Sequence, residues 1–327
     1  MQEPPFSINV KILGLVAKIQ AIIGELQVYA VPHSTTKVAI KLRKENKIRT
    51  IRSSLAIEGN NLTEDQITAI LENKRVIGPP NQILEVKNAL SVYDSISQYN
   101  PLKEKDFLVA HQELLKNLIK QSGKYRSTQV GVFKGTKVSH MAPPAKQVPL
   151  LMQELFKFLN KDRETPWLIK ACVFHYELEF IHPFEDGNGR MGRFWQQLLL
   201  IKQSPIFEHL STETLIYKRQ KDYYKVMEKC DRAGDSTQFI VYSLEIILSC
   251  LEDFRQKFRP TKAKVSDRIQ LALEYFGTKT FSRKEYLAIN KGISTATASR
   301  DLANGVKNNL ISKNGDKTKA VYRKNYT

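Results

Sequence analysis

The sequence predicts a mainly α-helical body that carries one small β-hairpin, followed by a C-terminal winged helix-turn-helix. Through most of residues 1–258, apolar side chains recur at helical spacing, which is typical of amphipathic helices. One stretch near the middle, rich in valine and turn-forming residues, interrupts this pattern and predicts the hairpin. Residues 266–327 change again, to three short helical segments and a second hairpin, which are the elements of a winged helix.

The helices of the body begin and end at recognisable signals. Thr63 and Gln66 form a capping box, and Gly78 with the two prolines after it breaks the chain before the next helix. The hairpin is expected within residues 121–144, where valines lie among turn formers. Helices are expected at about 12–26, 38–57, 64–71, 82–99, 103–119, 148–160, 165–180, 189–202, 213–232 and 237–259.

The last part of the chain is predicted to be a separate basic unit. Residues 260–327 hold 14 Lys and Arg against 5 Asp and Glu, a net charge of +9 out of +18 for the whole chain. An aperiodic segment around Pro260 predicts a linker ahead of this unit. We expect an N-terminal helical region at 1–100, a core domain at 101–258, the linker at 259–265, and the winged helix at 266–327 with helices at 268–276, 282–289 and from Ser294 and a hairpin at 310–321.

The composition excludes several classes of protein. With 327 residues, 42% of them hydrophobic and 26% charged, the chain is globular with a core and is neither disordered nor fibrous. The net charge of +18 favours a phosphate-bearing partner, either nucleic acid or nucleotide. Cys172, Cys230 and Cys250 are far apart in apolar sequence, which indicates reduced core thiols. Because charges interrupt the first apolar segment, we expect no signal peptide and no membrane span, hence a cytoplasmic protein.

A glycine-rich loop between two expected helices carries the most specific chemistry. Gly187, Asn188 and Gly189 stand just before a helix, where bare backbone N–H groups and the helix N-terminus bind anions such as phosphates. Arg190 and Arg193 project from the first turn of that helix and can add forked contacts to phosphate oxygens. The loop therefore predicts a cradle for a di- or triphosphate.

Two further side chains of this loop suit group transfer. Asp186 offers a hard oxygen ligand beside the cradle, the usual way in which Mg²⁺ is held by one carboxylate together with substrate phosphates. His182 has an unperturbed pKa of roughly 6.5, which suits accepting a hydroxyl proton at neutral pH. Positioning, charge neutralisation and one base together predict phosphoryl-type transfer.

The loop resembles the Fic motif, His-Pro-Phe-x-Asp/Glu-Gly-Asn-Gly/Lys-Arg, at every specified position. This resemblance implies that His182 is the general base, Asp186 the Mg²⁺ ligand and Phe184 the hydrophobic anchor of the loop. It also implies that residues 187–190 hold the α- and β-phosphates of ATP. Fic enzymes mostly move AMP from ATP to a target hydroxyl, whereas the Doc branch, which moves a phosphate, has Lys at the position of Gly189. Gly189 therefore favours AMP transfer.

The resemblance covers about residues 40–257 and assigns two further surfaces. Residues 123–126 and the hairpin after them look like the flap of the family, whose exposed edge holds the target segment as an added strand. Tyr224 and Met227 would lie against the adenine and Asp231 near the ribose, where the family commonly has Asn. The docking stretch of the flap would be Lys134, Gly135, Thr136, Lys137, Val138, Ser139, His140 and Met141.

A segment ahead of the loop resembles the inhibitory motif of Fic proteins, Ser/Thr-x-x-x-Glu-Gly/Asn, which Ser54, Glu58 and Gly59 match. By itself this segment is a helix C-terminus in which Gly59 takes the left-handed turn, although an acid is mildly unfavourable there. The resemblance implies that Glu58 pairs with Arg193, so that ATP binds with its α-phosphate turned away from in-line attack. Some family members use the same Glu to position water and remove AMP from the target, and this alternative stays open.

The expected function is that of an autoinhibited, Mg²⁺-dependent protein adenylyltransferase that uses ATP and modifies an unidentified target protein. The alternatives are a deAMPylase that uses Glu58 and a DNA-binding regulator whose body senses nucleotide. The winged helix suits DNA, a target protein or a second copy of the chain. Its candidate DNA contacts are Thr297 and Arg300 for base edges and Lys313, Lys317 and Lys319 for phosphates. The remaining histidines lack metal-ligand spacing and are expected on the surface or in the core: His33, His111, His140, His175 and His209.

Overall fold

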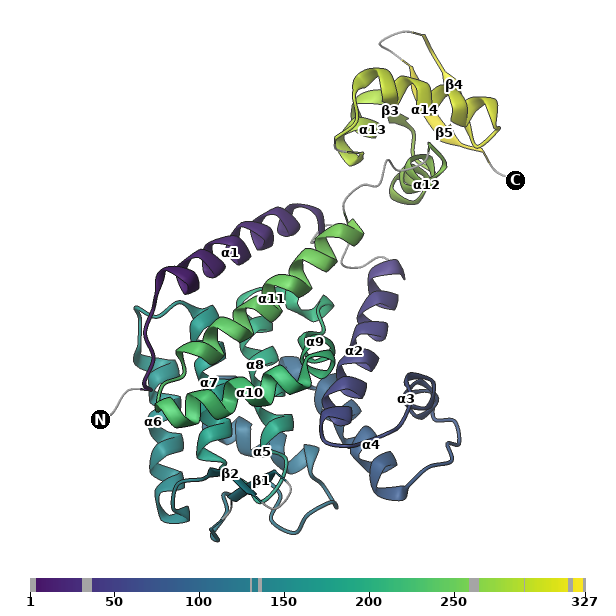
Figure 1. Cartoon of the computed structure of the whole chain (residues 1–327). Helices are drawn as coiled ribbons and strands as arrows, with labels where there is room; N and C mark the ends of the chain where they lie inside the picture. Colours follow the sequence, from purple (N-terminus) through teal and green to yellow (C-terminus); the bar gives the residue numbers. More distant parts are fainter. Residues whose placement is uncertain are drawn as a thin grey trace. The chain divides into compact units, whose positions relative to one another are not determined.

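The computed structural model describes residues 4–30, 37–129, 131–134, 137–258, 265–290, 292–316 and 320–325. The chain divides into two compact units, Met1–Gln256 and Lys257–Thr327. Most described residues are helical, and the strands form two small antiparallel sheets (Figure 1). The predicted fold class is therefore confirmed. Within the described ranges, the helices are all too short or too polar to cross a bilayer.

The first unit consists of helices joined by turns, with one hairpin. The capping box predicted at Thr63 and Gln66 is confirmed, since each side chain bonds the backbone N–H of the other residue. The helices are α1 (Val10–Ala30), α2 (Lys37–Ile57), α3 (Glu64–Leu71), α4 (Pro80–Asp94), α5 (Glu104–Leu114), α6 (Val148–Lys161), α7 (Trp167–Ile181), α8 (Asn188–Gln203), α9 (Thr212–Lys218), α10 (Gln220–Ala233) and α11 (Thr237–Phe258), with short 3₁₀ helices η2 (Ile96–Gln98), η3 (Ala145–Gln147) and η4 (Pro205–His209).

Three predicted helices differ from those in the structure. The helix expected at 82–99 ends at Asp94 and is followed by the 3₁₀ helix η2. The helix expected at 213–232 is broken at Arg219 into α9 and α10, and Ile216 before the break and Tyr223 after it are both buried. The helix expected at 103–119 ends at Leu114, and the turn that follows places Asn117 at a φ of +61°. The hairpin lies within the expected segment, where β1 (Gly131–Lys134) pairs antiparallel with β2 (Lys137–Met141).

The core of the first unit is built around α7 and α8, which pack against each other (Figure 1). The helix α7 is itself apolar on all of its faces, as expected for a helix in the centre of a domain. Phe107, Phe174, Phe194 and Trp195 are fully buried and meet edge to face or at a tilt. The three cysteines are free and buried, which confirms the prediction of reduced core thiols. The loop between α7 and α8 is therefore held by the buried aromatic core of the first unit.

The second unit contains the three predicted helices and the predicted hairpin, together with one strand that the sequence did not predict. Its helices are α12 (Val265–Phe276), α13 (Arg283–Ile289) and α14 (Thr295–Lys307), and its strands β3 (Phe281–Ser282), β4 (Ile311–Asn314) and β5 (Val321–Lys324) form a sheet in the order β3-β5-β4. Ser294 caps α14 by accepting from the Thr297 N–H, as predicted. The buried Asp301 of α14 accepts from Arg268 of α12 and from the Tyr286 hydroxyl, which fixes the three helices together.

Candidate functional site

Two left-handed residues turn the chain between α7 and α8. His182 ends α7 at a φ of +50°, and its N–H donates to the Leu178 carbonyl. Gly187 begins α8 at a φ of +84°. A Cβ atom at Gly187 would lie 2.6 Å from Leu115 Cδ2, so both the backbone conformation and the packing require glycine. Residues 182–187, with the first turn of α8, are called the Fic loop below.

Phe184 anchors the Fic loop in the core. Its side chain is fully buried, and its ring packs against Phe107 and Tyr125. The Asn188 amide closes the loop from inside, because Oδ1 accepts from the Phe184 N–H at 2.9 Å and Nδ2 donates to the Phe184 carbonyl at 3.0 Å. Both polar atoms of the Asn188 side chain thus hold the loop.

Two residues outside the loop hold it from α5 and from the start of the hairpin. His111 stacks on Phe184 and contacts the Asp186 carbonyl through Nε2 at 3.0 Å. Burial lowers the pKa of His111 to about 4, so its ring is neutral at physiological pH. Arg126 donates from Nε to the His182 carbonyl at 2.7 Å and from its backbone to the Pro183 carbonyl. The sequence predicted a core or surface role for His111 and gave no signal for its contact with the loop.

Arg190, a predicted phosphate contact, is held by two carboxylates. Its side chain is 5% exposed, and Nη1 donates to Glu85 at 3.1 Å while Nη2 donates to Asp186 at 2.8 Å. Nε of Arg190 is buried without a hydrogen-bond partner among the described residues. Glu85 in turn accepts from the Asn60 amide at 2.8 Å. Glu85 was missed by the sequence analysis, because an acid on a helix carries no signal of which arginine it will meet.

Arg193 pairs with the residue that the inhibitory motif singled out. Its Nη2 lies 2.7 Å from Glu58 Oε1 and also donates to the Ser54 carbonyl at 3.1 Å, while Nε donates to Ser54 Oγ at 3.1 Å. The Arg193 guanidinium is buried, whereas the Glu58 side chain is 35% exposed. Burial acts to lower the pKa of Arg193, but Glu58 together with the neighbouring Tyr223 and Glu179 outweighs it, and the pKa is raised above its ordinary value. Arg193 is therefore fully charged, and Glu58 balances that charge.

Gly189 provides the space for this ion pair. A Cβ atom on Gly189 would lie 2.6 Å from Glu58 Oε1 and 3.0 Å from Arg193 Nη1. Any larger residue at position 189 would have to displace the Glu58 carboxylate. The resemblance to the family implies that Gly189 favours AMP transfer over phosphate transfer, and the structure gives this glycine a second, steric role.

The two candidate catalytic side chains lie at the mouth of the loop. His182 is half-buried, and its Nδ1 lies 3.4 Å from the Glu179 carbonyl. The Asp186 side chain is 56% exposed, with Oδ1 accepting from the Gly187 N–H and Oδ2 from Arg190. No cluster of three acidic, His or Cys ligands occurs among the described residues. A cation at Asp186 would thus complete its shell with phosphate oxygens and water, which fits the ligand habits of Mg²⁺.

The predicted adenosine-contacting residues share one face of α10. Tyr224, Met227 and Asp231 are spaced by three and four residues, with Tyr224 exposed and Met227 half-buried. Asp231 accepts from the Tyr176 hydroxyl at 3.0 Å. The same helix contacts the inhibitory segment, because the Gln220 amide donates to the Ile57 carbonyl at the end of α2.

The predicted docking stretch and DNA contacts are described only in part. In the stretch 134–141, the backbone forms parts of β1 and β2, while Gly135 and Thr136 lie outside the described residues. In the second unit Arg300 is exposed, and the Thr297 hydroxyl lies 3.0 Å from Ser294 Oγ within the cap of α14. Lys313 pairs with Asp316 at 3.4 Å. Lys317 and Lys319 lie outside the described residues.

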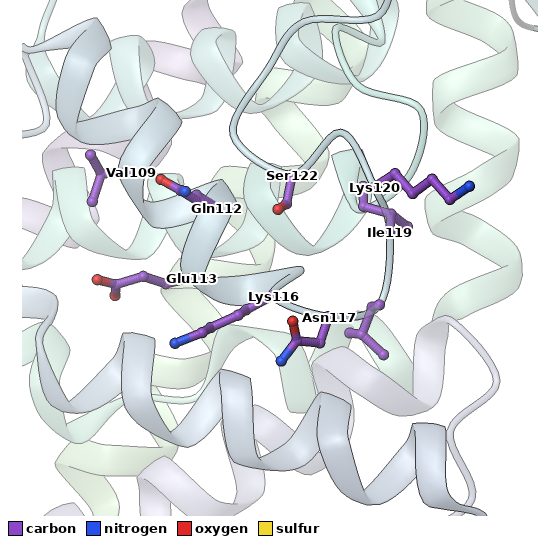
Figure 2. Close-up of a pocket in the computed structure, with 9 residues that line it drawn as sticks. Val109, Gln112, Glu113, Lys116, Asn117, Ile119, Lys120 and Ser122 are labelled. Carbon is purple, nitrogen blue, oxygen red and sulfur yellow. The ribbon is translucent and has the colours of Figure 1, made fainter.

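A surface pocket of about 750 Å³ lies at the end of α5 and the turn after it (Figure 2). Gln112, Lys116, Asn117 and Lys120 line it with exposed side chains. None of its lining residues was predicted to be functional. Exposed polar side chains are typical of an open hollow, so the chemistry is better placed at the Fic loop.

Substitution of Gly187 by Ala is expected to destabilise the protein by about 1–3 kcal/mol more than Gly234→Ala. Both glycines are left-handed, at φ values of +84° and +62°, and share a backbone penalty of roughly 1–2 kcal/mol. Only the Gly187 Cβ would meet a neighbour within 4 Å, and overpacking costs about 1–3 kcal/mol. The free energies of unfolding from urea titrations give the comparison, and equal losses in the two variants would contradict it.

A helical body with a glycine-rich loop at the start of its central helix defines the class of this protein. A family model described as Fic/DOC family matches residues 101–200. A solved Fic family protein from Desulfovibrio desulfuricans G20 is 36% identical, with a TM-score of 0.75 and coverage of 100% of this chain and 99% of that one. The chain therefore belongs to the Fic family.

Curated relatives match this chain over a smaller share of their own length than the solved Fic family protein does. Protein adenylyltransferase Fic from Drosophila yakuba is 28% identical over 244 residues, covering 72% of this chain and 46% of that protein. The protein of the same name from Drosophila melanogaster is 29% identical over 229 residues, with 67% and 44% covered. This chain thus spans less than half the length of these relatives. Fic-1 from C. elegans, at 19% identity and a TM-score of 0.60, shares the fold.

Proposed function

We propose that this protein transfers AMP from ATP to a hydroxyl side chain of a target protein. The observation that carries this proposal is the Fic loop, in which one buried scaffold presents His182, Asp186 and the N-terminus of α8 at the same mouth. The fly relatives, whose matched regions cover 67–72% of this chain, are named protein adenylyltransferases, and these names support the same activity. In this proposal, the group that accepts AMP is a hydroxyl of a protein side chain.

In the proposed reaction, the target hydroxyl oxygen attacks the α-phosphorus of ATP. A new O–P bond forms, the bond to the β-phosphate oxygen breaks, and pyrophosphate leaves. His182 accepts the hydroxyl proton, and the 3.4 Å between its Nδ1 and the Glu179 carbonyl favours Nε2 as the accepting nitrogen. Backbone N–H groups at the start of α8 and the Arg190 guanidinium orient the phosphates. When bound at Asp186, Mg²⁺ would neutralise phosphate charge.

We further propose that Glu58 restrains this reaction. By resemblance to the family, Arg193 would bind the γ-phosphate of ATP, and in the structure its Nη2 lies 2.7 Å from Glu58 Oε1. While that ion pair persists, the γ-phosphate lacks its partner, so ATP binds with its α-phosphate out of line for attack. Release of Glu58 would restore the partner and align the substrate.

The proposed activity is tested by following label from α-labelled ATP in the presence of Mg²⁺. The acceptors are the protein itself and the proteins of a host-cell lysate, so that labelled bands identify targets. We expect little label with the unaltered chain and strong label once Glu58 is replaced. A folded variant that binds ATP and labels nothing would refute AMP transfer.

For the second unit we propose a winged helix that binds duplex DNA through α14. The supporting observations are the net charge of +9 over residues 260–327 and the exposed face of α14, which carries Arg300 and Lys307. Because the Thr297 hydroxyl is engaged in the cap, Arg300 is the stronger candidate for base contacts. The wing lysines would then contact phosphates.

This proposal predicts a steep loss of DNA affinity with salt. If four or five phosphates are contacted, the affinity of the full chain should fall by roughly 10²–10³ between 50 and 200 mM salt. Arg300→Ala is expected to weaken binding about 10-fold or more, consistent with roughly 1–3 kcal/mol for a base contact. Lys161→Ala removes an exposed charge from α6 and serves as the control. Binding that ignores salt and Arg300 would instead favour a module for docking a protein or a second copy.

A further inference from the structure

His111 connects three parts of the Fic loop and its surroundings. Its ring is fully buried at the last turn of α5 and stacks on Phe184, with the centroids 3.5 Å apart and the planes 6° from parallel. Nδ1 lies 2.8 Å from the Gly123 nitrogen, and Nε2 lies 3.0 Å from the Asp186 carbonyl oxygen. The His111 side chain thus contacts the Phe184 ring, the backbone carbonyl of Asp186 and the turn at Gly123 that leads to the hairpin.

The two hydrogen-bond partners fix the tautomer of this histidine. The Gly123 N–H can only donate, so Nδ1 is the nitrogen that accepts. The ring proton is therefore on Nε2, which donates to the Asp186 carbonyl. A phenyl ring at position 111 would keep the stack and lose both hydrogen bonds. A glutamine amide could keep the donor and lose the stack.

The carbonyl held by His111 belongs to the peptide group that joins Asp186 to Gly187. The orientation of this peptide sets both the start of α8 and the direction of the Asp186 side chain. The carboxylate itself is held by the Gly187 N–H and by Arg190, and these contacts use the same two oxygens that would coordinate Mg²⁺. The backbone contact with His111 does not compete with the cation and can persist throughout.

We propose that His111 is a positioning residue for Asp186 that sets the affinity of the loop for Mg²⁺-bound ATP. This inference rests on the proposed function of Asp186. Residues that orient a metal ligand commonly change metal affinity by about 10–100-fold when they are replaced. His111 meets that description from a buried helix, with a fixed tautomer and a hydrogen bond of normal length.

The test is calorimetric titration of ATP into Glu58→Gly protein, with and without His111→Phe, at several Mg²⁺ concentrations and in EDTA. We expect His111→Phe to raise the Kd of ATP about 10-fold in Mg²⁺ and to leave the Kd in EDTA unchanged. His111→Gln, which retains a donor for the carbonyl, should recover part of the Mg²⁺-dependent affinity. Labelled AMP transfer by the same proteins should require correspondingly more Mg²⁺.

His209→Phe is the matched control, because His209 stacks on Phe254 of α11 instead of on the loop. It should leave both Kd values unchanged. Equal Kd values for His111→Phe and its parent in Mg²⁺ would overturn the proposal. An equal loss in Mg²⁺ and in EDTA would overturn it as well, by assigning His111 a purely structural role. If Glu58→Gly binds ATP and transfers no AMP, the proposed function fails while the binding comparison still decides the role of His111.

Discussion

Glu58→Gly is expected to raise the rate of AMP transfer by about 100-fold. Removing one partner of a buried ion pair typically costs about 3–5 kcal/mol, or roughly 100-fold to 4,000-fold at about 1.4 kcal/mol per factor of ten. We take the lower end, because the Glu58 side chain is 35% exposed. In the variant, Arg193 keeps its two bonds to Ser54 and gains freedom to bind the γ-phosphate. Label transfer from α-labelled ATP under initial-rate conditions gives the measurement.

The same variant should be less stable than the unaltered protein in the absence of nucleotide and should gain more stability than that protein from added ATP. Without ATP, its melting temperature should fall, because a buried guanidinium has lost its carboxylate. Addition of ATP should raise that temperature more than in the unaltered protein, since a phosphate replaces the missing anion. Glu72→Gly is the control, because Glu72 pairs with Lys44 and Lys74 at the surface.

A target that already carries AMP separates the two directions of the reaction. If the protein is mainly a deAMPylase, the unaltered chain should remove the label and Glu58→Gly should lose that activity. If it is an inhibited transferase, Glu58→Gly should add AMP to an unmodified target. Replacing Glu58 should then make no difference to the removal of AMP from the modified target. A transfer rate that stays unchanged or falls in folded Glu58→Gly protein would end the inhibitory interpretation.

Replacing His182 is expected to lower AMP transfer by about 10²–10⁴-fold in the Glu58→Gly background, the usual range for loss of a general base. Asparagine is the informative replacement, because His182 has a φ of +50° and asparagine tolerates this left-handed conformation. The contact between Arg126 and the His182 carbonyl involves only the backbone and should survive. His182→Asn should therefore bind ATP and melt like its parent while transferring little or no AMP.

His182→Ala completes this experiment. It removes the same base but adds a left-handed alanine, so it should be less stable than His182→Asn and equally inactive. His209→Asn controls for loss of a histidine elsewhere in the first unit. Retention of most of the transfer activity in His182→Asn would show that another group accepts the proton, and the proposed mechanism would then be wrong.

The sequence alone determined the features that depend on neighbours along the chain. The Fic loop, the capping box at Thr63, the N-cap at Ser294, and the helix pattern of α6, α7 and α8 all follow from local spacing and turn chemistry. The break at Arg219 was missed because Ile216 and Tyr223, the buried residues on either side of it, are seven positions apart, which is also the spacing within one continuous helix face. The strand β3 was missed because two residues are too few to form a pattern.

Only the tertiary structure decided which distant side chains complete the site. Glu58 and Arg193 are 135 positions apart, and their pairing was expected from resemblance to the family and not from any spacing. Glu85 reaches Arg190 across 105 positions, and His111 reaches Asp186 across 75, with no local signal for either contact. A hydrogen bond depends on where two backbones are brought by packing. That packing is set by the core around α7 and α8, so the partners of the loop become visible only once the chain is folded.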